Sequence, residues 1–543
     1  MHDYIIVGAG SAGCVLAARL SEDPDVSVLL LEAGPADTCD NIHIPLGVTA
    51  LGHSAMDWDY STGCEPHCDG RRIHLPRGRT LGGSSSTNAM VYIRGNPADY
   101  DGWRDAGCAG WGFDDLLPYF KRAEDNQRGE SELHGTGGPL TVSEGRSRNP
   151  MMDAFVEAGE QAGLARNDDF NGPAQDGVGH YQLTQREGRR CSAAVAYLHP
   201  AMERPNLTVE THLQVERVVL DGMRAVAVEG QRLGEALRFE AAREVILCGG
   251  TYNSPQLLMQ SGIGPTEHLA ARLIEPVLDR PMVGRNLQDH VNIWALWRSP
   301  EAVSLATAMA PDYIDANVAC FEEQGTGPLT SNVAEAGAFV RTSADLGAPD
   351  LQLHAIPAIL SEDPPFGMAE HGISLGVCLL TPSSVGELYL SGPEPTGKPL
   401  IYHRYLEAED DMPRMEAGLE LLMELSCQPA LSGYCGVGEQ LPASSDKADR
   451  RAYIRRHAQT LFHPVGTCAM GPDEDAVVDV ELRVRGVDGL RVVDASVMPS
   501  VPRGNTNAPT IAVAERAADL IRGVVPTPEA RAPLKAAVEA GAA

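Results

Sequence analysis

The sequence has few aromatic residues, a deficit of basic side chains and no long apolar run. Phe, Trp and Tyr make up 5% of the 543 residues, and 74 Asp and Glu outnumber 43 Lys and Arg, for a net charge of −31. Such a negative protein repels nucleic acid and anionic lipid, so we expect no polyanionic partner. A charge-free, largely apolar candidate for a membrane segment, residues 372–386, is interrupted by Pro382. It is also shorter than the ~20 residues that a spanning helix needs, so we expect no membrane insertion.

We also expect neither a leader peptide nor a zinc site built on cysteines. The first strand-like run begins at Tyr4, which leaves no length for a signal or transit sequence. Cys64, His67 and Cys68 lie close together, but no second ligand pair follows at a spacing typical of zinc sites, so we expect no metal. The twelve cysteines are scattered, mostly in apolar segments, which favours a reduced, cytoplasmic protein.

What the sequence does contain is a dinucleotide-binding pattern at its start. An apolar run leads into a glycine-rich turn, a helix-like stretch at 12–20 and a second strand that ends just before Glu32. Gly8 permits the tight turn, Gly10 lets the backbone approach a pyrophosphate, and Gly13 lets helix and strand pack closely. The unsatisfied N–H groups at the helix start favour phosphate. Glu32 is placed to accept hydrogen bonds from ribose hydroxyl groups.

Four more motifs follow along the chain. Residues 78–88 form a Gly- and Ser-rich segment that can wrap a flat or phosphorylated ligand, with Arg79 to supply charge; taken alone, a flexible surface loop fits this segment equally well. Residues 250–264 follow a strand and read as a helix that starts near Pro255 and ends at a glycine. The remaining two are His-Pro-Val-Gly-Thr at 463–467 and Val-Asp-Ala-Ser-Val-Met-Pro at 493–499.

Together these motifs closely resemble the signature segments of the glucose-methanol-choline (GMC) family of FAD-dependent alcohol oxidoreductases, over residues 4–522. The likeness is greatest to the branch of choline oxidase, choline dehydrogenase and their aliphatic-alcohol relatives. It implies an α/β fold in which a discontinuous, doubly wound, Rossmann-like FAD-binding domain is combined with an α+β substrate domain built on an antiparallel sheet. We expect FAD-binding segments at 1–36, 70–98, 205–300 and 455–525, substrate-binding segments at 37–69, 99–204 and 301–454, and a tail at 526–543.

The resemblance also implies which residues contact FAD. Glu32 would hold the adenosine ribose, Val215 would lie beside the adenine, and Asp494 would line the path to the flavin. Some choline oxidases attach the flavin through a histidine at the position that Thr87 holds here, so we expect FAD to be bound non-covalently. The full set of expected contacts is Gly8, Gly10, Ser11, Ala12, Gly13, Glu32, Ala33, Arg79, Gly82, Gly83, Asn88, Ala89, Val215, Asp494, Ala495, Asn507 and Thr510.

His463 and Asn507 are the expected catalytic residues. A proline follows His463 and Gly466 permits a sharp turn, so the imidazole can be held on a rigid loop; a packed turn histidine is the alternative before the resemblance is considered. Asn507 precedes a helix that runs to about residue 521, where it could simply be the N-cap. In the family, a histidine takes the hydroxyl proton of a primary alcohol while the carbinol carbon passes a hydride to flavin N5.

The substrate is less sharply predicted than the cofactor. His354 resembles an active-site histidine of the choline branch, although a satisfied core histidine fits as well. Phe462 and Glu335 are the other candidates, but the aromatic pair that choline-oxidising relatives place before the glutamate is Val-Ala here, so a cage for a quaternary ammonium looks incomplete. We therefore expect a neutral aliphatic primary alcohol, with choline second.

Several alternatives stay open at this point. An FAD-containing hydroxynitrile lyase would keep the cofactor and the histidine without redox chemistry, whereas a nicotinamide-dependent dehydrogenase would leave all motifs after the first unexplained. The sequence does not choose between oxygen and a quinone-type molecule as electron acceptor, between oxidase and dehydrogenase, or between monomer and homodimer.

Overall fold

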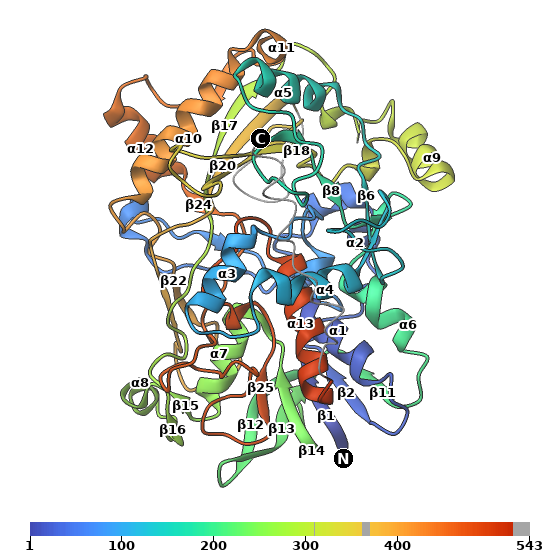
Figure 1. Ribbon diagram of the computed structural model, residues 1–543, viewed down its shortest axis with the longest axis vertical. Helices are drawn as coiled ribbons and strands as arrows, with labels where there is room; N and C mark the ends of the chain where they lie inside the picture. Colours follow the sequence, from blue (N-terminus) through green and yellow to red (C-terminus); the bar gives the residue numbers. More distant parts are fainter. Residues whose placement is uncertain (309, 361–369, 525–543) are drawn as a thin grey trace.

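Two sheets at opposite ends of the molecule organise the chain (Figure 1). The computed structural model describes residues 1–308, 310–360 and 370–524, and the tail expected at 526–543 lies outside them. No helix among the described residues is long and apolar enough to cross a bilayer.

The first sheet is built around buried parallel strands. Its order is β11-β2-β1-β14-β13-β12, and β25 pairs with β14 as well. The pairs of β1 with β2 and β14, of β2 with β11 and of β14 with β25 are parallel, whereas β12, β13 and the first half of β14 form an antiparallel meander. The strands are β1 (His2–Val7), β2 (Val28–Leu31), β11 (Leu207–Glu210), β12 (Gln214–Asp221), β13 (Arg224–Arg232), β14 (Glu235–Leu247) and β25 (Leu490–Val492).

The helices that pack around this sheet come from distant parts of the chain. Helix α1 (Ser11–Leu20) follows β1 directly and packs against the C-terminal helix α13 (Asn507–Arg522), which in turn contacts α4 (Phe113–Ala123). All three appear near the centre of Figure 1. The β1–turn–α1–β2 order confirms the βαβ unit that the glycine pattern predicts.

The second sheet is antiparallel throughout. Its order is β23-β17-β20-β19-β18-β7, and β24 pairs with β17. Helices α5 (Pro150–Gln161) and α10 (Asp411–Ser426) pack against it. The strands are β7 (Gly177–His180), β17 (Val291–Arg298), β18 (Ala336–Val340), β19 (Leu351–Ile356), β20 (Gly372–Leu379), β23 (Gly438–Gln440) and β24 (Gln459–Thr460).

The other α-helices of four or more residues lie outside the pairs of helix and sheet described so far. They are α2 (Asp40–His43), α3 (Pro97–Asp105), α7 (Gly250–Gln260), α8 (Thr266–Ala271), α9 (Ile314–Gln324), α11 (Pro429–Ser432) and α12 (Lys447–His457).

Helix α7 begins earlier than the sequence suggests. It starts at Gly250, so Pro255 lies inside the helix rather than at its start. A proline has no N–H to give to the carbonyl four residues back. Here that carbonyl, on Thr251, accepts a hydrogen bond from the hydroxyl of Thr467 at 2.6 Å, which compensates for the missing bond.

The predicted fold class is confirmed, because a doubly wound sheet and an antiparallel sheet are both present. The division into segments stays a prediction. Strand β17 lies within the segment 205–300 that was expected to bind FAD, and β24 within 455–525, yet both pair in the second sheet.

Candidate active site

A cavity of about 780 Å³ is lined by most of the residues that the sequence predicts for cofactor and substrate. Gly13, Gly82 and Glu335 do not line it. The predicted residues that do are Gly8, Gly10, Ser11, Ala12, Glu32, Ala33, Arg79, Gly83, Asn88, Ala89, Val215, His354, Phe462, His463, Asp494, Ala495, Asn507 and Thr510.

Gly8, Gly13 and Gly83 form a glycine cradle, and none of the three positions has room for a Cβ atom. A Cβ atom on Gly8 would lie 2.5 Å from the carbonyl oxygen of Cys248, and one on Gly13 would lie 1.9 Å from the carbonyl oxygen of Gly8. A Cβ on Gly83 would lie 2.7 Å from the Cα of Gly10, so the loop expected from residues 78–88 folds directly over the first glycine turn. A Cβ on Gly10 itself would meet no atom within 4 Å, because this residue lines the cavity.

Polar groups around this cradle suit an anionic dinucleotide. Gly10 is the N-cap of α1 and supplies no side-chain cap, so the first N–H groups of the helix are available to a phosphate. Arg79 lines the cavity with its Nε buried and without a hydrogen-bond partner, and its guanidinium lies 5.1 Å from the ring centre of Trp58. These residues therefore fit FAD as the group to be held.

Two buried carboxylates hold the cradle in place. Glu32 accepts hydrogen bonds from the backbone N–H of Ala9 (2.9 Å) and of Gly34 (2.8 Å). Asp494 accepts from the N–H of Gly250 (2.9 Å) and from the hydroxyl of Ser254 (2.5 Å), which fixes it at the start of α7. Burial raises the pKa of both carboxyl groups, in each case against the effect of these hydrogen bonds.

At the other end of the cavity, a chain of hydrogen bonds fixes the tautomer of His463. The Nε2 of His290 lies 3.1 Å from the carbonyl oxygen of Leu380, and its Nδ1 lies 3.0 Å from the Nδ1 of His463. A carbonyl oxygen can only accept, so the Nε2 of His290 carries the proton and its Nδ1 is the acceptor. The Nδ1 of His463 must then donate, which leaves its Nε2 with a free lone pair.

The backbone around His463 is held by a buried acid. Asp289 accepts a hydrogen bond from the backbone N–H of His463 at 2.8 Å and from the hydroxyls of Thr460 (2.6 Å) and Tyr405 (2.5 Å). Strand β24 ends at Thr460, and Phe462 adopts a positive φ of 70°. This turn presents the imidazole to the cavity.

Burial keeps the imidazole of His463 neutral. Its side chain is 8% exposed, and burial lowers its pKa well below 6.5, with further lowering by His290, His354 and Arg77. Burial also lowers the pKa of His290 to about 4, so His290 is neutral as well, as its place in the hydrogen-bond chain requires.

Asn505 rather than Asn507 contacts the free nitrogen of His463. The amide nitrogen of Asn505 lies 3.1 Å from the Nε2 of His463. Asn507 is the first residue of α13, after Thr506 as the N-cap, so it is not the N-cap itself. Its amide oxygen accepts a hydrogen bond from the hydroxyl of Ser11 at 2.7 Å. Both asparagines line the cavity, and the catalytic role of Asn507 stays a prediction.

His354 lies at the apolar end of the cavity. It sits on β19, where its strand neighbours are Gly337 and Gly376. A Cβ on Gly376 would lie 2.6 Å from the ring of Trp294, so this glycine makes room for a tryptophan beside the histidine. Both ring nitrogens of His354 are buried without a hydrogen-bond partner, and burial lowers its pKa to about 3.

The predicted substrate residue Glu335 is not part of this end, and the other residues that line it are mainly apolar. Glu335 lies away from the cavity and accepts a hydrogen bond from the hydroxyl of Ser331 at 2.5 Å. Besides His354 and Phe462, the lining there is Trp294, Val333, Ala334, Ile356, Leu360 and Leu461.

Sequence reasoning missed Asp289, His290 and Asn505. The first two lie within the expected FAD-binding segment 205–300 but outside every predicted motif, and nothing in the sequence alone brings them to His463. Asn505 stands in the same short run as Asn507, Gly-Asn-Thr-Asn at 504–507, so the motif was found, although it is Asn505 whose amide contacts the histidine in the structure.

Comparison with known proteins places this site in a family. The family model described as GMC oxidoreductase matches residues 2–292, and its C-terminal counterpart matches residues 382–514. The chain is 43% identical to an alcohol dehydrogenase [acceptor] of Pseudomonas putida, over 96% of both chains, and 42% identical to the mitochondrial choline dehydrogenase of Homo sapiens, over 96% of this chain and 90% of that one.

A solved structure gives the same result for the fold. A variant of formate oxidase from Aspergillus oryzae, described for the modification of its FAD, superimposes with a TM-score of 0.90 at 28% identity, over 96% of this chain and 98% of that chain.

Proposed function

The chain belongs to the GMC oxidoreductase family and is an FAD-dependent oxidoreductase that acts on CH–OH donors. From this premise we propose that it oxidises an uncharged aliphatic primary alcohol to the aldehyde, with the Nε2 of His463 as the base. The observation that carries this proposal is the hydrogen-bond chain from Leu380 through His290, which leaves that nitrogen unprotonated at the edge of the cavity.

The residues of the chain divide the work between binding and proton transfer. FAD, when bound, supplies the two-electron acceptor for the carbinol carbon. The glycine cradle, the start of α1 and Arg79 would hold its diphosphate, and Glu32 its adenosine ribose. His463 takes the hydroxyl proton, and the N–H of Asn505 is placed to hold the substrate oxygen beside the Nε2 as negative charge develops on it. Asn507 would face the same end of the cavity from the start of α13.

The lining of the substrate end supports an uncharged alcohol. Apart from the polar residues His463, Asn505 and Asn507, the residues assigned to this end are aliphatic or aromatic, with His354, whose pKa of about 3 makes it neutral; no carboxylate is among them. A neutral imidazole with two unpartnered nitrogens can hydrogen-bond a hydroxyl but gives no charge to a cation. The alcohol dehydrogenase [acceptor] of Pseudomonas putida, at 43% identity, is the relative whose name agrees with this assignment.

Choline is the second candidate, and two observations bear on it. The human relative is named a choline dehydrogenase, and Trp294 lines the substrate end, where its face could meet a trimethylammonium group. Trp58 also lines the cavity, but the guanidinium of Arg79 already lies over its ring. A cage of several aromatic faces is therefore missing among the described residues.

Replacing His463 tests the assignment of the base. In His463→Ala the protein should keep its FAD absorbance, whereas anaerobic reduction of the flavin by alcohol should slow by about 10²–10⁴-fold because the proton acceptor is gone. Stopped-flow absorbance at the flavin band measures this rate. A matched variant is His67→Ala, which removes an exposed histidine that does not line the cavity. Near-normal reduction in His463→Ala would exclude the assignment.

A panel of alcohols under nitrogen tests the reaction and the substrate together. We expect straight-chain primary alcohols to bleach the flavin faster than choline at equal concentration. Bleaching also separates alcohol oxidation from a hydroxynitrile lyase, which would leave the flavin oxidised. Assays for peroxide and for reduction of a quinone analogue then identify the electron acceptor, for which oxygen and a quinone are both proposed.

We also propose a cytoplasmic location and a monomer or homodimer. All twelve cysteines of the chain are unpaired in the structure, which is compatible with a reducing compartment. Cell fractionation and light scattering of the purified protein test these two proposals.

A further inference from the structure

Two histidines and two aspartates meet in a cluster that the alcohol chemistry does not use. The Nδ1 of His53 lies 2.6 Å from the Oδ1 of Asp59, and the Nε2 of His74 lies 3.3 Å from both the Oδ2 of Asp57 and the Oδ1 of Asp59. One ligand atom from each of the four residues lies within 4.8 Å of the other three. The imidazole rings of His53 and His74 stack, with their centres 3.9 Å apart.

We propose that His53, Asp57, Asp59 and His74 bind one divalent cation of the Zn²⁺ class. Zn²⁺ accepts imidazole nitrogen and carboxylate oxygen at about 2.0–2.2 Å in a tetrahedron, which separates the ligand atoms by roughly 3.3–3.6 Å. The two contacts of His74 at 3.3 Å already match this spacing. Mixed nitrogen and oxygen donors also favour Zn²⁺ over Mg²⁺ or Ca²⁺, which take oxygen ligands.

Backbone hydrogen bonds already orient one of the carboxylates. The Oδ1 of Asp57 accepts from the N–H of Asp59 and of Arg77, both at 2.9 Å, and its Oδ2 accepts from the N–H of His53 at 3.0 Å. Supporting bonds of this kind fix the direction of a metal ligand and increase affinity. The side chain of Asp57 is 3% exposed, whereas those of His53 and Asp59 are about half exposed, so a cation from solution can reach the site.

One cation of the protein itself competes for the cluster. The Nζ of Lys398 lies 3.1 Å from the Oδ2 of Asp59 and also donates to the backbone carbonyl of Asp59. A bound Zn²⁺ would repel this ammonium group at such short range. The two cations therefore exclude each other, which gives the proposal a consequence that a purely structural ion-pair cluster does not share.

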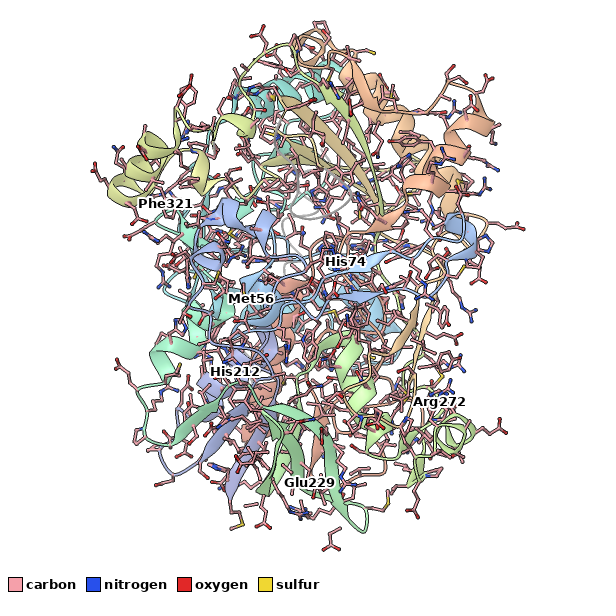
Figure 2. The ribbon with its side chains drawn as sticks, turned by 180° about the vertical axis from the view of Figure 1, so that it is seen from behind. Met56, His74, His212, Glu229, Arg272 and Phe321 are labelled. Atoms are coloured by element: carbon pink, nitrogen blue, oxygen red, sulfur yellow. The ribbon has the colours of Figure 1, made fainter. Side chains whose placement is uncertain are left out.

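The position of the cluster suggests that the metal would brace a wall of the cofactor cavity. Asp57 and His74 both line that cavity. Figure 2 shows His74 and Met56, which neighbours Asp57 in the chain, at mid-height between the two ends of the molecule. Trp58, between the two aspartates, lies under the guanidinium of Arg79. The metal would thus tie the segment 53–59 to residue 74 close to a predicted FAD contact.

The test uses the intact, FAD-containing protein after treatment with a chelator. Titration calorimetry with Zn²⁺, together with elemental analysis after desalting, should give one Zn²⁺ per chain. His53→Gln and Asp59→Asn each remove a half-exposed ligand, and we expect affinity to fall by about tenfold or more, the range that disturbing a metal site typically costs. His67→Gln, which removes an exposed histidine outside the cluster, should bind like the parent protein.

Lys398→Gln should change the affinity for Zn²⁺ in the opposite direction. Removing the competing ammonium group should tighten Zn²⁺ binding, while His53→Gln weakens it. FAD absorbance and circular dichroism confirm that each variant is folded. The proposal is overturned if the parent protein binds no Zn²⁺, if the ligand variants bind as tightly as the parent and His67→Gln, or if Lys398→Gln weakens binding.

Discussion

At the residue scale, the position of one proton decides whether His463 can act as a base. The Nδ1–H of His463 is held only by the Nδ1 of His290, whose own proton is committed to the carbonyl of Leu380. The amide N–H of Asn505, 3.1 Å from the Nε2, favours the same tautomer, but among the described residues only His290 offers the Nδ1–H an acceptor. His290 is therefore a positioning residue, comparable to the group that orients the histidine in other base-assisted enzymes.

This argument predicts the effect of replacing His290 by two different side chains. His290→Phe keeps a planar ring but removes the acceptor, so flavin reduction by alcohol should slow by about 10–100-fold at unchanged FAD content. His290→Gln can accept from His463 with its amide oxygen and donate to Leu380 with its amide nitrogen, so it should recover much of the rate. Anaerobic stopped-flow absorbance compares the two. Equal losses in both variants would show that His290 only fills space.

The pKa of His463 predicts the pH profile of the reaction. Burial, with help from His290, His354 and Arg77, holds that pKa well below 6.5, and the protonated imidazolium cannot take a proton from the substrate. The rate of flavin reduction should therefore stay level from neutral pH down to about 6.5, the ordinary pKa of histidine, and fall only at lower pH. A profile of kcat/KM against pH measures it. An acid limb centred above pH 7 would contradict the burial argument.

The sequence predicted His463 because its short motif resembles a family signature and because the proline after it restricts the backbone. It could not predict Asp289, His290 or Asn505 as partners, since their contacts with His463 span 174, 173 and 42 positions of the chain. Glu335 is the opposite case, a substrate contact that the resemblance to relatives suggested and that local contacts alone would not. The structure places Glu335 beside Ser331 and outside the cavity lining, and its role stays a prediction.

At the scale of elements, the turn between β1 and α1 separates cofactor binding from folding. Gly10 has an ordinary φ of −76° and free space where a Cβ would lie, whereas a Cβ on Gly13 would clash with the carbonyl of Gly8 at 1.9 Å. Gly10 is therefore needed only for binding the molecule that enters the cavity. Gly13 is needed only for packing the helix against the strand.

Replacing each glycine by alanine should therefore give opposite results. Gly10→Ala should change the stability of the flavin-free protein by no more than about 0.5 kcal/mol, as at an uncrowded site, but weaken FAD binding because the methyl group occupies the cavity. Gly13→Ala should destabilise the protein by about 1–3 kcal/mol through overpacking. Thermal unfolding of flavin-free samples and fluorescence titration with FAD measure the two effects. Equal loss of stability in both variants would refute this separation.

The elements themselves were predicted where the local pattern is strong. The βαβ unit and the helix before residue 521 agree with the sequence because their glycine and apolar spacing is decisive. The start of α7 was placed five residues late, since Pro255 is tolerated only because Thr467, more than 200 residues away, satisfies the carbonyl of Thr251.

At the scale of the whole molecule, the cavity joins segments that the sequence keeps far apart. Its lining comes from the first strand, the loop at 78–88, the antiparallel sheet and the start of α13. The fold class followed from recognisable motifs, but β17 and β24 show why the domain limits could not be read from them. These strands lie within the predicted FAD-binding segments but pair in the other sheet. This pairing places His463 at the cavity.

Because the cavity is lined from both sheets, FAD should stabilise the whole protein and not only its first domain. A ligand that binds only the native state adds about 2.7 kcal/mol when its concentration is 100 times its Kd, so Tm should rise with added FAD after the cofactor is removed. Thr87 lines the cavity, and we expect FAD to be bound there without a covalent bond, so that it can be removed intact. Precipitation with trichloroacetic acid should leave the yellow colour in the supernatant. Colour in the pellet would show a covalent link. A Tm unchanged by FAD, or two separate transitions of which FAD raises only one, would contradict this prediction.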